Sequence, residues 1–481
     1  MHPTKDEIFQ VCKQYDCIPV YTTQPYHGEN IQDIYQTYRG AYSSLFELNS
    51  KEQKYSIIAL PAASRLMSDG LQTTRITKQM TISKQESPYV AIEALRKKAA
   101  PTLPLPDIFT GGLLGHINYD AIRLQEYIPD NLPSMDLPMI HLCIAQHLVI
   151  IDHLNQLVYF ITYLMLDTQV QSAISKAYED CEQQLTQMQE QFQHRKKYQQ
   201  QVIQTKECMS NMHEDTFYHM VEQAKQHIYE GDIFQIVLSQ RFHCEFEQDP
   251  FQAYSRLREI GNTPYLYYFD FGDYVLAGAS PELLLKANAS DIMTMPIAGT
   301  RKRGSTRIED EQLEQDLLHD PKELAEHHML VDLGRNDIGK ISSPSQVKVT
   351  QYKQIKRYSH VMHLCSEVHG TLLPGLKHTD ALASLLPAGT LSGAPKIRAM
   401  QLIEELEPCK REVYGGSICL FDYRQITQCL ITIRTILFHH QQAYVQAGAG
   451  IVKDSIPEKE YEETRHKAGM LLDALGCGGV L

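Results

Sequence analysis

The chain has 481 residues, more than one simple hydrophobic core usually supports, so two domains or one large layered unit are expected. Hydrophobic residues make up 43% and charged residues 21% of the sequence, as in an ordinary globular enzyme. The net charge of −13 argues against nucleic acid as the main partner, because phosphate binding requires a basic face. A small anionic substrate is not excluded, since it needs only a local cluster of cations.

No targeting or membrane segment is predicted. The first ten residues, MHPTKDEIFQ, have neither the basic region nor the apolar region of a secretory signal. The most apolar stretch, 139–166, is interrupted by polar residues and predicts two buried strands joined by a turn. The eleven cysteines form no CxxC pair, which favours reduced thiols in a cytoplasmic protein.

In chain order, three regions are distinguished. Residues 1–180 alternate short strand-like runs, such as YSIIAL at 55–60, with helical stretches. Residues 181–210 are rich in Gln, Lys and Glu and predict a solvated helix or a loose polar connector. Residues 211–475 follow a more regular pattern of strands and helices.

Within this third region, strands occur in runs and helices in runs, which favours an α+β layered fold over a doubly wound parallel sheet. The predicted strands cover 233–242, 265–271, 274–280, 417–421, 429–438 and 443–452. The predicted helices cover 215–232, 309–337, 379–386, 395–406 and 457–475.

Two predicted helices each carry a pair of acidic residues three positions apart. Glu323 and Glu326 share one helix face, and Glu460 and Glu463 repeat the spacing on the last helix. Four such carboxylates can hold Mg²⁺, which prefers oxygen ligands. From spacing alone, solvated acidic faces are the commoner explanation. Zinc is disfavoured because the chain has no HExxH motif.

Two glycine-bearing segments could approach an anion with their backbones. Residues 386–408 are a loop that runs into a helix, where free amides can bind an anion, although an ordinary connection is the commoner case. Residues 446–452, QAGAGIV, end a predicted strand and lack the third glycine of a dinucleotide-binding motif. They allow close approach of a ligand, or mark a bulge.

Three single residues stand out in apolar surroundings. Arg434 lies inside the predicted strand 429–438 and needs an anionic partner, which is a ligand or an internal carboxylate. His363 is a catalyst or a core histidine. Glu282 is a carboxylic acid with a raised pKa or a carboxylate stabilised at a helix start.

The order and spacing of these motifs resemble the chorismate-utilising enzymes. The resemblance covers about 211–475 continuously and 109–123 more loosely, and it is greatest for the anthranilate synthase component I branch. It is carried by MPIAGTRKRG, KELAEHHMLVDLGRNDIGKI, YSHVMHL, LPAGTLSGAPKIRAMQLIEELEP, VYGGSICLFDY, ITIRT and QAGAGIVKDSIPEKEYEETRHKA. It implies an α/β/β/α sandwich around two large, mainly antiparallel sheets. It also implies that residues 211–475 are the chorismate-binding catalytic domain and that residues 1–180 are an N-terminal region that completes the sheets and carries regulation.

The resemblance also implies a site for chorismate, a dianion. Mg²⁺ is expected on Glu326 and Glu463, with Glu323 and Glu460 in support, and it would hold the ring carboxylate. Residues matching the contacts of the enolpyruvyl carboxylate are Tyr414, Arg434, Gly448 and Gly450. Further substrate contacts match Ala298, Gly299, Thr300, Thr390 and Lys467.

The implied reaction adds ammonia at C2 of the ring while the C4 hydroxyl leaves, and then eliminates pyruvate to form anthranilate. Glu282 matches the general acid for the hydroxyl, and His363 matches the residue associated with the elimination. Gln235 stands where relatives that add water carry a lysine base, and it can orient ammonia instead.

Ala298 distinguishes the anthranilate-forming reaction from the reactions of related branches of the family. Aminodeoxychorismate synthases carry a nucleophilic lysine there, and alanine cannot replace it. A third branch, the aminodeoxyisochorismate synthases of secondary metabolism, stops at the aminated intermediate, and the presence of His363 argues against it. A catalytically silent regulatory homologue is disfavoured because every matched acid, the arginine and the histidine are present.

Two partners are implied besides chorismate. The chain has no segment that resembles a glutaminase, so a separate glutamine amidotransferase subunit is expected to supply ammonia for this first step of tryptophan biosynthesis. Tryptophan is expected as a feedback inhibitor. The residues that match its site are Glu47, Pro264, Tyr265 and Leu266, with Leu48 standing where the family has serine.

Overall fold

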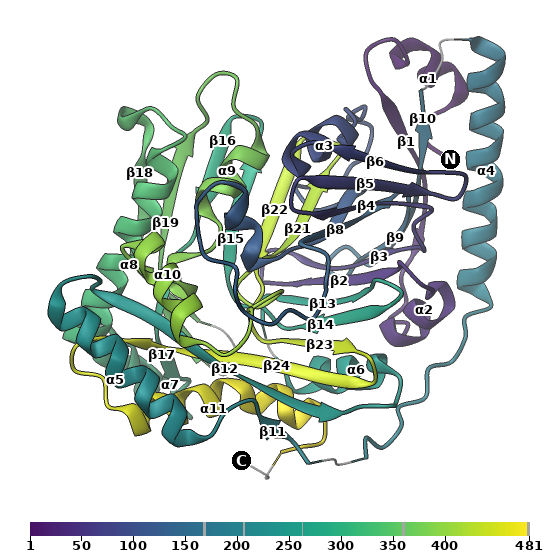
Figure 1. The fold of residues 1–481 in the computed structure, drawn as a ribbon. Helices are drawn as coiled ribbons and strands as arrows, with labels where there is room; N and C mark the ends of the chain where they lie inside the picture. The colour runs from purple at the N-terminus through teal and green to yellow at the C-terminus, as the bar shows by residue number, and fades with distance from the viewer. Residues whose placement is uncertain (167–169, 205–206, 262, 358–360, 479–481) are drawn as a thin grey trace.

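The computed structural model describes residues 1–166, 170–204, 207–261, 263–357 and 361–478. Within these residues, two twelve-stranded sheets pack face to face, and helices cover their outer sides (Figure 1). Neighbouring strands run antiparallel in each sheet, as the pairing registers show. The predicted α+β sandwich of two mainly antiparallel sheets is therefore confirmed.

The first sheet contains strands from both halves of the chain. In spatial order they are β1 (Cys17–Pro25), β10 (Leu157–Met165), β9 (His147–Asp152), β3 (Lys54–Ala59), β2 (Ser44–Asn49), β13 (Tyr265–Asp270), β14 (Tyr274–Gly278), β23 (Thr435–His439), β24 (Gln442–Ile451), β12 (Gln235–Glu245) and β11 (Met209–Ser210), with β20 (Gly393–Ala394) paired to β12.

The second sheet is equally mixed. Its order is β17 (Ile297–Lys302), β19 (Val361–Thr371), β16 (Asp291–Thr294), β15 (Leu283–Asn288), β22 (Ile426–Ile431), β21 (Ser417–Asp422), β7 (Gly112–Ile117), β8 (Ile140–Ala145), β4 (Ser64–Asp69), β5 (Gln72–Thr77) and β6 (Thr81–Gln85), with β18 (Lys348–Arg357) paired to β19.

Helices pack on the outer face of each sheet. The α-helices are α1 (Lys5–Val11), α2 (Ile31–Tyr38), α3 (Pro88–Leu95), α4 (Gln171–Gln193), α5 (Glu214–Glu230), α6 (Pro250–Ile260), α7 (Arg307–His319), α8 (Pro321–Gly339), α9 (His378–Leu385), α10 (Lys396–Leu406) and α11 (Pro457–Ala474). Short 3₁₀ turns are η1 (Tyr119–Leu124), η2 (Pro344–Gln346) and η3 (Gly389–Leu391). Helices α4, α6 and α11 contact the first sheet, and α7, α8 and α9 contact the second (Figure 1).

The alternation of side chains along a strand explains the layering. On β13, Tyr267 packs into the core between the two sheets, and its neighbour Tyr268 packs into the core under the outer helices. Successive side chains point to opposite faces, so one strand contributes to both cores. This is why β13 is apolar from Tyr265 to Phe269.

The apolar stretch 139–166 forms three strands, and the prediction of two was wrong. β8 belongs to the second sheet, whereas β9 and β10 pair in the first. The chain changes sheets at Gln146, between β8 and β9. Because both segments are buried, hydrophobicity does not mark the change.

The predicted single helix 309–337 is two helices. Asp320 ends α7 and accepts hydrogen bonds from the backbone N–H groups of Lys322 and Glu323 as the cap of α8. Pro321 occupies the first turn of α8, and a residue before proline avoids the helical conformation. The Asp-Pro pair is therefore the start signal that the sequence prediction overlooked.

Only part of the predicted polar connector, 181–210, connects the two regions, because its first residues belong to a helix. Residues 181–193 continue α4, which buries Cys181, Leu185 and Met188 against the first sheet. Its Gln-rich outer face is solvated, as predicted, and residues 205–206 lie outside the described part of the chain. No helix in the described part of the chain has the length and apolarity needed to cross a membrane.

Candidate active site

Two segments that cross between the sheets lie side by side and carry Glu282 and Arg434. The chain leaves β14 in the first sheet and enters β15 in the second through Glu282. It returns from β22 to β23 through Arg434. The backbone N–H of Ala279 donates to the Arg434 carbonyl at 3.0 Å, and that of Ile431 donates to the Glu282 carbonyl at 3.1 Å. The crossing point of the sheets thus places an acid beside a cation.

The prediction of one strand over 429–438 was wrong at this crossing. β22 ends at Ile431 and β23 begins at Thr435, and Arg434 between them has a φ of 49°. A left-handed conformation is unfavourable for arginine, and such outliers gather at functional sites. The apolar residues on both sides are buried in different sheets, so the sequence pattern shows no break.

The buried surroundings of Glu282 favour the protonated form of its carboxyl group. The residue is 8% exposed, and Thr390 Oγ1 donates to Glu282 Oε1 at 3.2 Å. Burial raises the pKa of Glu282 to about 8, although the Thr390 hydroxyl, Arg434 and Lys467 act in the opposite direction. At neutral pH this carboxyl can act as a general acid.

Glu282 and Thr390 line a cavity of about 380 Å³ that is partly open to solvent. Sequence reasoning missed much of its wall, which is formed by Thr294, Pro296, Leu330, Leu333, Gly334, Asp337, Leu385 and Ile431. A signal was available in α8. Positions 326, 330, 333 and 337 follow the helical repeat, so Leu330, Leu333 and Asp337 share the face of Glu326.

Residues 297–302 form strand β17 in the second sheet. β17 pairs with β19, and the register shifts between Ala298 and Thr300. Gly299 forms this bulge with a φ of 65°, and a Cβ there would lie 2.7 Å from Leu317 Cδ1. The glycine therefore allows α7 and α8 to pack closely on the bulge.

His363 on β19 faces this bulge. Its Nδ1 lies 3.0 Å from the Gly299 carbonyl oxygen and 3.1 Å from Thr300 Oγ1. Nδ1–H therefore donates to the carbonyl, and the ring is basic at Nε2. Burial lowers the pKa of His363, the Gly299 carbonyl opposes this, and Arg434 adds to the lowering. The imidazole is neutral at pH 7.

The four acidic residues on α8 and α11 lie within electrostatic reach of one another. The pKa of Glu326 is raised by burial first and then by Glu323 and Glu463, against the charge of Lys467. The pKa of Glu460 is likewise raised by burial and by Glu463. The four acids thus form one acidic cluster by their mutual electrostatic influence, although no three of their carboxylate groups, among the described residues, bring oxygens within 4.8 Å of one another.

Lys467 joins this cluster to β24. Its Nζ lies 2.6 Å from Glu463 Oε1 and donates to the Gly448 carbonyl at 3.0 Å. The acids and the strand with the two glycines therefore border one site.

The remaining predicted residues meet on the other side of β24. A Cβ at Gly448 would lie 2.8 Å from the Tyr414 hydroxyl, and one at Gly450 would lie 2.8 Å from Gln235 Nε2. Gln235 is 4% exposed, and its Oε1 has no hydrogen-bond partner among the described residues. A buried acceptor without a partner is unfavourable unless a ligand supplies the donor.

The residues matched to tryptophan binding lie together, apart from this site. β2 and β13 are neighbours, with Glu47 opposite Leu266 and Leu48 opposite Tyr265. The Glu47 carboxylate accepts hydrogen bonds from Tyr254, Arg258 and Ser56. Asn262, two residues before Pro264, lies outside the described residues, as do residues 358–360, the first three of the YSHVMHL motif.

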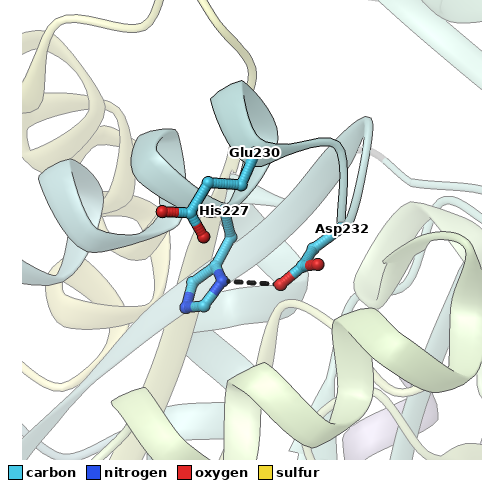
Figure 2. Close-up of side chains that lie close together, drawn as sticks. All are labelled: His227, Glu230 and Asp232. Carbon is cyan, nitrogen blue, oxygen red and sulfur yellow. Dashed lines mark hydrogen bonds and ion pairs between the residues drawn. The ribbon is translucent and has the colours of Figure 1, made fainter.

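A second group of ligand-type side chains lies at the end of α5. His227, Glu230 and Asp232 form the one set in the described chain whose three ligand atoms lie within 4.8 Å of one another. Figure 2 shows the His227 ring facing the Asp232 carboxylate, with 2.9 Å between Nδ1 and Oδ2. Arg398 donates to the same oxygen at 3.2 Å. This arginine supplies the positive charge, so the group is explained as an ion-pair network.

Comparison with known proteins identifies the family. The family described as chorismate binding enzyme matches residues 43–473. The anthranilate synthase component 1 of Acetivibrio thermocellus is 40% identical over 99% of both chains, and that of Aquifex aeolicus is 37% identical over 98% of this chain and 97% of its own.

Solved structures of similar proteins support the same family. The crystal structure of anthranilate synthase component I from Streptococcus pneumoniae has a TM-score of 0.79 and 37% identity, covering 88% of this chain and 93% of its own. The menaquinone-specific isochorismate synthase of Escherichia coli has a TM-score of 0.72 at 19% identity over 98% of both chains, a likeness of fold. The chain therefore belongs to the chorismate binding enzyme family, and it lies among the anthranilate synthase components of that family.

Proposed function

We propose that this chain converts chorismate and ammonia to anthranilate and pyruvate, as the large subunit of an anthranilate synthase. The names of its relatives support this activity. The observation that carries the choice of nucleophile is the pair Ala298 and Gln235, because neither side chain offers an amine or a base at the ring. The nucleophile is therefore ammonia from outside the chain.

In the proposed reaction, the unpartnered Gln235 Oε1 accepts a hydrogen bond from ammonia and orients it toward C2 of the ring. Glu282, which is protonated at neutral pH, gives its proton to the leaving C4 hydroxyl. Thr390 holds the carboxyl in place by donating to Oε1. The balanced outcome of this first step is the aminated ring and one water.

The second step eliminates pyruvate and makes the ring aromatic. We assign the proton transfer of this step to neutral His363, whose ring is oriented by the Gly299 carbonyl. Arg434 and Tyr414, with the backbone at Gly448 and Gly450, are proposed to hold the enolpyruvyl carboxylate. Ala298, Gly299 and Thr300 border the ring.

We further propose that Mg²⁺ binds Glu326 and Glu463, with Glu323 and Glu460 in support. The residues fit the ion, because burial first and neighbouring carboxylates second raise the pKa values of Glu326 and Glu460, and a hard cation stabilises such acids in their charged form. Bound there, Mg²⁺ would neutralise the ring carboxylate of the substrate. Lys467, paired with Glu463, helps to balance the charge of the cluster.

Three proposals concern partners and compartment. A separate glutamine amidotransferase subunit supplies ammonia, and the component 1 names of the relatives support a second component. Tryptophan binds near Glu47, Pro264, Tyr265 and Leu266 as a feedback inhibitor. The protein works in the cytoplasm, which agrees with eleven cysteines that form no CxxC pair in the sequence.

The test is incubation with chorismate, Mg²⁺ and ammonium, followed by identification of the products by mass. Anthranilate and pyruvate in equal amounts are expected. Aminodeoxychorismate would overturn the role of Ala298, and aminodeoxyisochorismate without pyruvate would overturn the elimination step.

A further inference from the structure

A fully buried ion pair lies directly behind the substrate residues. Glu407 follows α10 and Arg411 lies four residues further on. Arg411 Nη2 donates to Glu407 Oε1 at 2.5 Å, and its Nε donates to Oε2 at 2.9 Å. The two side chains are 1% and 2% exposed. Burying two charges is costly, and apolar residues of similar volume often stabilise a fold as well. The pair therefore calls for an explanation other than stability.

The remaining donors of Arg411 hold two backbone segments of the site. Nη1 donates to the Leu391 carbonyl at 2.5 Å, and Nη2 donates to the Val237 carbonyl at 2.6 Å. Leu391 follows Thr390, the partner of Glu282. The guanidinium also lies over the rings of Tyr119 and Tyr414, at 4.9 and 5.7 Å from their centroids.

Glu407 holds β12, the strand that carries Val237. Its Oε1 accepts hydrogen bonds from the Ser239 N–H and hydroxyl, both at 2.8 Å. Gln446 Nε2 on β24 donates to the same hydroxyl at 2.8 Å. The carboxylate therefore links β12 to β24.

The strand register connects these contacts to the substrate residues. Val237 lies opposite Gly450, and Ser239 lies opposite Gly448. Gly448 in turn approaches the Tyr414 hydroxyl. The ion pair thus touches the immediate neighbours of Thr390, Gly448 and Gly450 and the face of Tyr414.

We propose that Glu407 and Arg411 are positioning residues that fix the enolpyruvyl-carboxylate end of the site. They do not contact substrate, because they are buried behind Tyr414 and β12. The fork of five N–H groups on arginine fits this task, since one rigid group holds a carboxylate and two carbonyls at once. The proposal rests on the proposed function, which places the enolpyruvyl carboxylate at Tyr414, Gly448 and Gly450.

The test compares two ligands in Arg411→Lys. Chorismate carries the enolpyruvyl group, whereas anthranilate keeps the ring and its carboxylate but lacks that group. Lysine preserves the charge and loses the fork. With Mg²⁺ present and ammonia absent, calorimetry is expected to show the Kd of chorismate raised about tenfold or more. The Kd of anthranilate is expected to stay unchanged.

Arg424→Lys is the matched control. Arg424 bonds to the Asp422 carboxylate and to the Leu105, Pro106 and Ile108 carbonyls, none of which is a proposed substrate contact. It has the same kind of partners without contacts to substrate residues. This variant is expected to bind both ligands as the unaltered protein does.

Ser239→Ala provides a milder second variant if Arg411→Lys does not fold. It removes one hydrogen bond to Glu407 and the link to Gln446, so a smaller but equally selective loss of chorismate affinity is expected. Equal weakening of both ligands, or of neither, in a folded variant would overturn the positioning role. Failure of the unaltered protein to bind chorismate would instead count against the proposed function.

Discussion

Glu282 shows how one buried carboxyl sets a pH dependence. Its pKa is raised to about 8 by burial, so it is protonated and able to donate below that pH. We predict that kcat/KM falls as pH rises through about 8, and that Glu282→Gln loses about 10²- to 10⁴-fold in kcat. The measurement is a pH profile in which free ammonia is held constant at each pH. A profile for the unaltered enzyme that stays flat to pH 10 would contradict the assignment.

The same group predicts a stability effect with a definite sign. Between its ordinary pKa of 4.5 and its folded pKa of about 8, the folded state binds a proton that the unfolded state has lost. Unfolding free energy therefore falls with rising pH in this window, by about 1.4 kcal/mol per unit. Urea unfolding of Glu282→Gln is expected to lack this slope, and Glu404→Gln, outside the site, is the control that keeps it.

The acidic cluster gives a second prediction at the scale of residues. Glu326→Gln and Glu463→Gln each remove one proposed Mg²⁺ ligand, so Mg²⁺-dependent turnover is expected to fall by at least about 100-fold, as for a lost metal contact. The readout is activity against Mg²⁺ concentration. Glu462→Gln is the control, because Glu462 neighbours Glu463 but pairs with Arg465. Near-normal activity in either test variant would refute the metal assignment.

At the scale of elements, the two glycines of β24 differ in what a side chain at each position would contact. A Cβ at Gly448 would lie 2.9 Å from the Leu238 carbonyl as well as near Tyr414, whereas a Cβ at Gly450 would meet only the Gln235 amide. The Leu238 backbone cannot easily move away from an added methyl group, but the end of the Gln235 side chain can.

We therefore predict that Gly448→Ala loses both stability and activity, and that Gly450→Ala keeps its melting temperature but loses turnover as Gln235 is displaced. Thermal unfolding and steady-state kinetics of both variants test this. A Gly450→Ala enzyme with normal kcat would show that the Gln235 amide has no role in the reaction.

Several helices and strands were predicted correctly from the sequence, and the missed breaks between strands have one physical cause. Helix α5 was predicted because its apolar side chains follow a helical repeat, and β13 because it is a short run of apolar and aromatic residues. The breaks at Gln146 and Arg434 were missed because one polar residue between two buried apolar runs does not show that the chain passes from one sheet to the other. Those crossings depend on long-range pairing, which local pattern does not contain.

The site was predicted from resemblance, and spacing alone could not have assembled it. Glu282 and Arg434 are far apart in sequence and meet only because two crossings are hydrogen-bonded side by side. Glu407 and Arg411 escaped notice because a buried ion pair at the end of a helix has the same spacing as a solvated one. Their partners, Val237 and Leu391, contribute backbone carbonyls that no sequence motif displays.

For the whole molecule, the first sheet links the proposed regulatory residues to the reacting centre. Glu47 lies on β2, which pairs with β13, which pairs with β14, and Glu282 follows β14. Tryptophan bound at β2 and β13 is therefore expected to raise the apparent KM for chorismate and leave kcat unchanged. Initial rates at several tryptophan concentrations test this, and an unchanged rate at millimolar tryptophan would exclude feedback.

The shared sheets also predict that residues 211–475 do not fold alone, although they were assigned as the catalytic domain. Without residues 1–180, β13 loses its neighbour β2, and β21 loses its neighbour β7. The pairing of β21 with β7 runs from Ser417 opposite Ile117 to Asp422 opposite Gly112. Two central strands would then expose unpaired backbone groups and the apolar face between the sheets, which favours aggregation. Circular dichroism and urea unfolding of the isolated fragment are expected to show no cooperative transition, whereas co-expression with residues 1–180 restores it. A fragment that unfolds cooperatively by itself would show that the N-terminal strands are an accessory layer and that the catalytic core is independent of them.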